Sequence, residues 1–187
     1  MKVCTKGVHS DFVMSVHEEA LLIDQSKIDR SYFETEEFYD FVRRALENTA
    51  RTRDRTKIKL YARILVRAPI LDNAVFRSSI EDFFSILLEL SPTDLHLARA
   101  AFKQQKDLAE EFISIEQDEL RHVKESGWDD LSNTLGMDKS QFGLSVAKLV
   151  RVGLLRQVIG TYQSYIGDAY SITPVFRTLM KLVEKLE

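Results

Sequence analysis

Residues that could bind a metal ion are few in this sequence, and their spacing completes no known site. Glu119 and His122 have the spacing of one half of a helical di-iron centre. Such a centre needs a second Glu-x-x-His motif and two further glutamates, and the chain has no second copy of the motif. Two glutamates follow His17 without a histidine at position 21, so the zinc-protease pattern is incomplete too. We therefore predict no metal site.

Motifs for nucleophilic catalysis and phosphate binding are missing as well. The sequence contains no Gly-x-Ser-x-Gly elbow, and its first 126 residues contain no glycine-rich phosphate loop. Aromatic residues at helical spacing, such as Phe83 and Phe84, are typical of a packed core. The sequence thus predicts a protein that is not an enzyme and that uses no small-molecule cofactor.

Positive charge is concentrated in residues 43–67, which contain 9 Lys or Arg and 2 Asp or Glu. Residues 68–119 show the reverse, with 4 Lys or Arg and 11 Asp or Glu. Because the planar guanidinium of arginine suits phosphate and carboxylate, this basic stripe is a candidate site for an anionic partner. The alternative, which we favour, is a solvated surface of two helices neutralised by the acidic segment. The candidate residues are Arg51, Arg53, Arg55, Lys57 and Lys59.

The end of the chain differs from the rest, because six of its seven glycines lie after residue 126. The pattern there predicts a helix at 128–135, a tight turn, and a helix from Lys139 to about Val152 that is capped by Asp138. Two short strands near 154–159 and 169–173 and a last helix follow. This order is the layout of a winged helix-turn-helix.

Two functions compete for the exposed face of the helix that begins at Lys139. Polar and basic side chains there suit phosphate and base contacts, which indicates binding to double-stranded DNA. The residues that carry this hypothesis are Lys139, Ser140, Gln141, Lys148 and Arg151.

Apolar side chains in the same region favour a protein interface instead. The expected wing at 161–166 contains no Lys or Arg, and two apolar residues lie at the centre of the helix face. Clustered aromatic and aliphatic side chains without lysine are typical of interface cores. We therefore favour a protein partner or homo-oligomerisation and keep DNA binding as the alternative. The interface residues are Leu144, Ala147, Tyr162, Tyr165 and Ile166.

Residues before 113 are predicted to form helices. The expected ranges are 11–23 (with a strand as the alternative), 35–46, 54–68, 76–90 and 92–112. The predicted fold class is mainly α: an N-terminal helical bundle followed by a winged helix-turn-helix with a small β-hairpin. We predict an N-terminal segment at 1–34, a bundle at 35–112 and a winged-helix-like domain at 113–187, and the helix at 92–112 can be shared.

Several short motifs resemble an uncharacterised bacterial protein family. They are Phe41-Val42-Arg43-Arg44-Ala45, Leu60-Tyr61-Ala62-Arg63-Ile64-Leu65, Ile80-Glu81-Asp82-Phe83, Leu87-Leu88-Glu89-Leu90-Ser91-Pro92-Thr93-Asp94, Val152-Gly153-Leu154-Leu155 and Ile172-Thr173-Pro174. The chain is similar, over about residues 36–180, to the abortive-infection alpha group, which is associated with phage exclusion. The resemblance implies a fold and a link to phage defence, and it supplies no catalytic residues.

The cellular compartment is predicted from what the sequence lacks. A single cysteine, Cys4, cannot form an internal disulfide and agrees with a reducing compartment. No stretch reaches the ~18–20 apolar residues of a membrane helix, and residues 1–20 show no basic-then-apolar signal pattern. We expect a cytoplasmic protein without a membrane partner.

Overall fold

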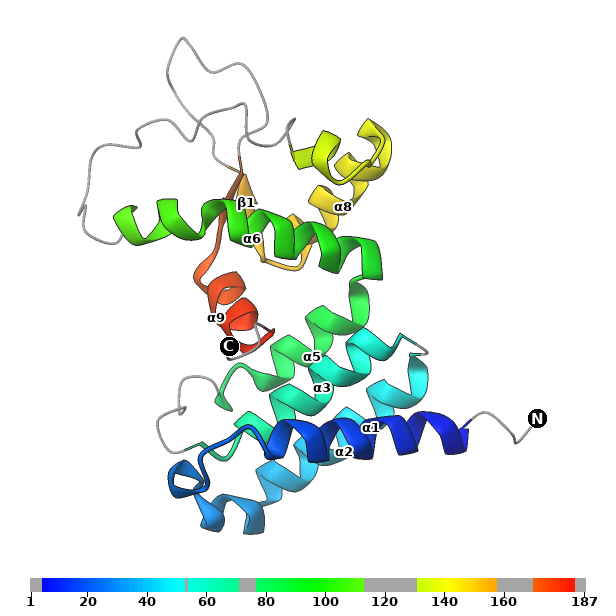
Figure 1. Cartoon of the computed structure of the whole chain (residues 1–187), viewed down its shortest axis with the longest axis vertical. Coiled ribbons are helices and arrows are strands. Elements are labelled where there is room, and N and C mark those ends of the chain that lie inside the picture. Colours follow the sequence, from blue (N-terminus) through cyan, green and yellow to red (C-terminus); the bar gives the residue numbers. More distant parts are fainter. Residues whose placement is uncertain (1–4, 53, 71–76, 113–130, 158–169, 184–187) are drawn as a thin grey trace. The chain divides into compact units, whose positions relative to one another are not determined.

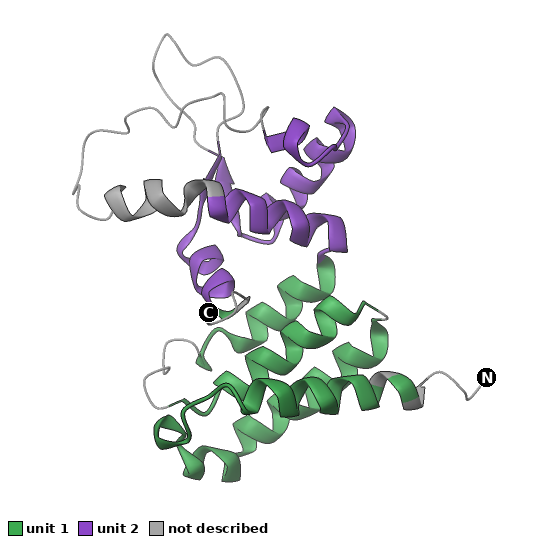
Figure 2. Cartoon of the chain, viewed as in Figure 1, with its two compact units in different colours: residues 1–89, 182–187 green, residues 90–181 purple. Residues whose placement is uncertain are grey.

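The structure is a computed structural model that describes residues 5–52, 54–70, 77–112, 131–157 and 170–183 (Figure 1). It is mainly helical, with one small two-stranded antiparallel sheet among the described residues, so the predicted mainly α class is confirmed. The chain divides into two compact units, which Figure 2 colours separately. Unit 1 comprises residues 1–89 and 182–187, and unit 2 comprises residues 90–181.

The division between the two units falls after Glu89. The helix expected to be shared therefore belongs to unit 2, and residues 1–34 belong to the same unit as the helices that follow them.

Unit 1 is a helical bundle whose central element is α3 (Arg55–Arg67), which contacts α1, α2 and α5. This helix is buried on more than one side, because Leu60 and Ile64 are buried as well as Ile58 and Tyr61. A helix that is apolar on several sides must be covered by neighbours on several sides. The remaining elements of unit 1 are α1 (Thr5–Ala20), η1 (Gln25–Lys27), η2 (Arg30–Glu34), α2 (Glu36–Arg51) and α5 (Ile80–Glu89).

Local capping fixes where these helices begin. The Thr35 hydroxyl accepts a hydrogen bond from the Phe38 amide at 3.2 Å, and the Asp54 carboxylate accepts one from the Thr56 amide at 2.9 Å. Each cap satisfies an amide that has no partner within its helix. The first helix is different: α1 begins at Thr5, before the expected range of 11–23, so Ser10 lies inside it.

Unit 2 contains α6 (Pro92–Phe112), a helical turn at 131–134, α8 (Lys139–Arg151) and the strands β1 (Leu155–Gln157) and β2 (Tyr170–Ile172). Helix α9 (Pro174–Val183) follows β2 and contributes Phe176, whose ring lies 6.0 Å from that of Phe102 on α6. The two strands are antiparallel, with Leu155 opposite Ile172. Both of these residues are buried, so the small sheet closes one side of the unit 2 core.

Tight turns on both sides of α8 set its ends. Before it, Gly136 has a φ of 62°, a left-handed conformation that favours glycine, and the Asp138 carboxylate caps the helix. After it, Gly153 has a φ of 76° and the Leu154 amide donates to the Leu149 carbonyl at 2.9 Å. This bond and the glycine together form a Schellman C-cap, so β1 starts directly after the helix.

Candidate functional site

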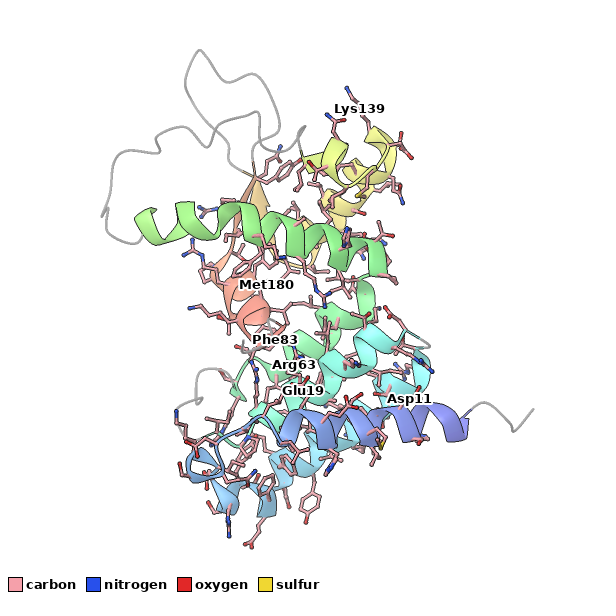
Figure 3. All side chains as sticks on the ribbon, in the orientation of Figure 1. Asp11, Glu19, Arg63, Phe83, Lys139 and Met180 are labelled. Carbon is pink, nitrogen blue, oxygen red and sulfur yellow. The ribbon has the colours of Figure 1, made fainter. Side chains whose placement is uncertain are left out.

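The outer face of α8 carries most of the residues that the sequence proposed for binding. Leu144 lies within it, 70% exposed, and Figure 3 shows Lys139 extending from the start of the helix. Val146 and Leu149 are buried on the opposite face. The exposed positions of α8 are Lys139, Ser140, Gln141, Gly143, Leu144, Ala147 and Arg151.

The first turn of α8 is already occupied by a carboxylate of its own chain. Oδ1 of Asp138 accepts hydrogen bonds from the amides of Ser140 and Gln141, both at 2.9 Å. A helix N-terminus attracts anions because its amides are unpaired and its dipole is positive. Asp138 satisfies two of these amides and brings negative charge to this end, so the helix start offers little to a phosphate.

Lys148, a predicted phosphate contact, is bound to a buried carboxylate. Its Nζ lies 3.0 Å from Oδ2 of Asp94, which is only 2% exposed at the start of α6. The Ser145 hydroxyl, also on α8, donates to Oδ1 of Asp94 at 2.6 Å. The amide and hydroxyl of Ser91 both donate to Oδ2 at 2.7 Å. One carboxylate therefore caps α6 and joins it to α8.

The environment of Asp94 keeps its carboxylate ionised. Burial alone would raise its pKa, but the hydrogen bonds from Ser145, Ser91 and Lys148 outweigh burial and lower the pKa to about 2. Sequence reasoning recognised Ser91 and Asp94 only as local capping residues. No local signal connects them to Ser145 and Lys148, which lie 51 and 54 positions after Asp94.

The other residues proposed for the α8 region have mixed outcomes. Ala147 is exposed beside Leu144, and Arg151 is exposed in the last turn of the helix. Tyr162, Tyr165 and Ile166 lie outside the described residues. The structure thus brings together the helical part of both candidate surfaces.

The basic stripe does not form one continuous cationic surface among the described residues. Lys57 is buried and donates to the Leu88 carbonyl at 3.3 Å, and Arg55 is exposed with Asp11 3.6 Å away. Arg51 and Lys59 are exposed, and Arg53 lies outside the described residues.

Acids from several helices neutralise neighbouring arginines of the stripe. Arg44 pairs with Glu81 of the acidic segment at 3.0 Å. Arg63 is buried, and its Nε donates to Glu19 of α1 at 2.8 Å; Figure 3 labels both residues. Part of the neutralising charge thus comes from α1, not only from residues 68–119 as the sequence suggested.

Comparison with known protein families, curated proteins and solved structures finds no match to this chain. Within the described ranges, no helix is long and apolar enough to cross a membrane. In the same part of the chain, no group of three or more His, Cys, Asp or Glu residues could hold a metal ion.

Proposed function

We propose that unit 2 is a winged helix-turn-helix domain. The order of α6, the helical turn at 131–134, the Gly136 turn, α8, β1 and β2 supports this proposal, because it follows the order of that fold. In such a domain α8 takes the place of the recognition helix, and the residues expected to form the wing, 161–166, lie outside the described residues.

The domain's proposed role is to bind protein, in a regulatory or adaptor protein without enzymatic activity. The observation that carries this role is Leu144, which is 70% exposed in the position where a DNA reader presents polar side chains. Ala147 extends the apolar area by one turn, and Lys148 is held by Asp94. Apolar side chains with a polar rim are the composition of an interface core.

Photo-crosslinking tests this role without requiring a known partner. A benzophenone side chain placed at Leu144 in cells that produce the protein natively should yield a discrete protein adduct on illumination. The same group at Val175 is the control, because Val175 is an exposed apolar residue of the same unit on α9. A protein captured at 144 must then bind the purified chain, and Leu144→Asp should abolish that binding while Val175→Asp leaves it unchanged. Absence of a position-specific adduct contradicts the proposed role.

DNA binding is the second candidate, and one observation favours it: Lys139, Gln141 and Arg151 are exposed on the same helix. If α8 reads DNA, Lys139→Ala and Arg151→Ala should each weaken duplex binding and reduce its salt dependence by about one ion. Fluorescence anisotropy with labelled duplex at ~50 mM salt measures both effects. If these variants weaken duplex binding and position 144 gives a nucleic-acid adduct, DNA binding would replace protein binding as the proposed role.

The resemblance to the abortive-infection alpha group supports a biological setting for such an adaptor, namely phage defence. Plating efficiency of phage on cells with and without the gene tests it. If Leu144→Asp removes protection and Val175→Asp retains it, the α8 face is required for that role.

A further inference from the structure

The outer side of α1 exposes several large apolar side chains among polar ones, although it faces away from the unit 1 core. Phe12 and Ser15 of this helix are buried, and Asp11 and Glu19 contact residues of α3. On the other side Met14 is 55% exposed and Leu21 is 72% exposed. Val13 and Leu22 are exposed as well. An apolar group of this kind on a surface helix marks a contact site.

The outward residues follow the spacing of a helix–helix seam. Positions 7, 10, 14, 17 and 21 alternate steps of three and four residues, the repeat that places side chains along one line of a helix. The Leu21 amide donates to the His17 carbonyl at 3.2 Å, so Leu21 continues the helical path beyond Ala20. The residues of this α1 seam are Gly7, Ser10, Met14, His17 and Leu21.

Side-chain size changes systematically along the α1 seam. The first two positions are small, since a Cβ added at Gly7 would meet nothing within 4 Å and Ser10 carries only a hydroxymethyl group. The last two, His17 and Leu21, are large. A helix with this gradient fits an antiparallel copy of itself, because each small residue then lies opposite a large one. A parallel copy would place Leu21 against Leu21 and leave a gap at Gly7.

We propose that α1 forms an antiparallel contact with α1 of a second copy of this chain, with the two-fold axis at Met14. Leu21 then fills the space at the partner's Gly7, and His17 lies within one residue of the level of the partner's Ser10. The contact is isologous, so both helices contribute the same residues and the assembly closes as a dimer.

Charges beside the α1 seam fit this symmetry. A groove of about 230 Å³ between α1 and α3 is lined by Met14, Glu18, Arg55 and Lys59, together with Asp11, Ser15 and Ile58. The two helices run in the same direction, because Asp11 faces Arg55 and Glu19 faces Arg63. The groove therefore has Arg55, paired with Asp11, and Lys59 at the levels of residues 11 and 15 of α1, and the exposed Glu18 at its other end.

Rotation about Met14 brings opposite charges together. Residue 18 of one copy comes to the level of residue 10 in the other, next to the partner's Arg55. Two equivalent pairs between Glu18 and the partner's Arg55 result, one on each side of the axis. Such complementarity selects one orientation of the helices and disfavours the parallel one.

This dimer uses a surface of unit 1 and does not depend on the role proposed for α8. A dimer of this kind would carry two copies of the α8 face. The α1 seam and the α8 face are therefore tested by separate variants, and failure of one leaves the other standing.

Sedimentation equilibrium of the full chain tests the proposal. The wild type should be a dimer, Met14→Glu should be monomeric, and Met14→Leu should remain dimeric. Circular dichroism must show the same helix content in all three. Leu144→Asp is the control outside the seam and should leave the dimer intact. A monomeric wild type, or a dimer that persists in folded Met14→Glu, overturns the proposal.

Charge exchange tests the antiparallel arrangement. Glu18→Arg and Arg55→Glu should each raise the dimer dissociation constant by about tenfold, because each breaks two pairs and sets like charges together. The double variant should return the constant to within about threefold of the wild type, because the pairs reform with reversed sign. If the dissociation constant of the double variant is raised by the two single effects combined, the antiparallel arrangement is wrong.

Discussion

Replacing Asp94 with asparagine tests whether one buried carboxylate holds α6 and α8 together. The carboxylate accepts from the Ser91 amide, the Ser91 hydroxyl, the Ser145 hydroxyl and Lys148 Nζ, at 2.6 to 3.0 Å. Asparagine can keep its oxygen toward Ser91 and Lys148 and turn its amide N–H₂ toward Ser145, whose hydroxyl must then accept a hydrogen bond instead of donating one. The change replaces charge-assisted hydrogen bonds with neutral ones, so Asp94→Asn should cost about 2 to 3 kcal/mol of the free energy of unfolding.

Replacing either of the two α8 residues that contact Asp94 should lower the free energy of unfolding by less. Ser145→Ala removes one neutral donor and should cost about 1 to 2 kcal/mol. Lys148→Met should cost about 1 kcal/mol or less, because the lysine side chain is 42% exposed and its attraction to Asp94 is screened. Urea unfolding followed by circular dichroism measures all three variants under the same conditions.

The pH dependence gives a second measurement of the same group. The pKa of Asp94 is lowered to about 2 in the folded chain, so its contribution is complete above the unfolded value near 3.9 and is lost as the pH falls through 2. This shift corresponds to about 2 to 3 kcal/mol of the total cost. The difference in the free energy of unfolding between wild type and Asp94→Asn should therefore shrink as the pH falls from 4 to 2. Equal stability of the two proteins at pH 7, or a difference that grows toward pH 2, would refute the reasoning.

Two further predictions concern other parts of the chain. Glu19→Gln should cost about 3 kcal/mol because it leaves the buried guanidinium of Arg63 without its carboxylate, whereas Arg43→Ala, which breaks exposed pairs, should change stability by less than about 0.5 kcal/mol. Gly153→Ala should destabilise by about 1 kcal/mol because its φ is 76°, while Gly143→Ala on the exposed side of α8 should stabilise by about 0.5 to 1 kcal/mol. Thermal and urea unfolding check both pairs, and similar effects within either pair would contradict the argument.

Local rules predicted some of the helix starts. Asp138 was expected as a cap from residue type and position alone, and the structure confirms it. Thr173 accepts from the Phe176 amide at 3.2 Å, as the Thr-Pro start of the last helix indicated. These features depend on residues within four positions of each other, which a single sequence displays directly.

Contacts between distant residues were not predictable in the same way. In the sequence, Lys57 belongs to the basic stripe and would be expected on the surface. In the structure, other helices surround α3, so Lys57 is buried and its ammonium contacts the Leu88 carbonyl. Nothing near Lys57 in the sequence shows that it lies against the end of α5. The α1 helix was hard to recognise from the sequence for a different reason. Its outer side carries apolar residues as well, so the alternation between inward and outward positions is weak.

The bond between Lys148 and Asp94 also bears on the choice between protein and DNA as the ligand of α8. A phosphate that recruited Lys148 would remove one of the donors that keep a buried carboxylate ionised. The cost of weakening that network, about 1 kcal/mol or less for the loss of Lys148, would be subtracted from the binding energy of the new contact. A protein surface that covers Leu144 needs no such exchange, because Asp94 keeps all four of its hydrogen bonds. The internal anchoring of Lys148 therefore favours a ligand that binds the apolar part of the helix and leaves the lysine where it is.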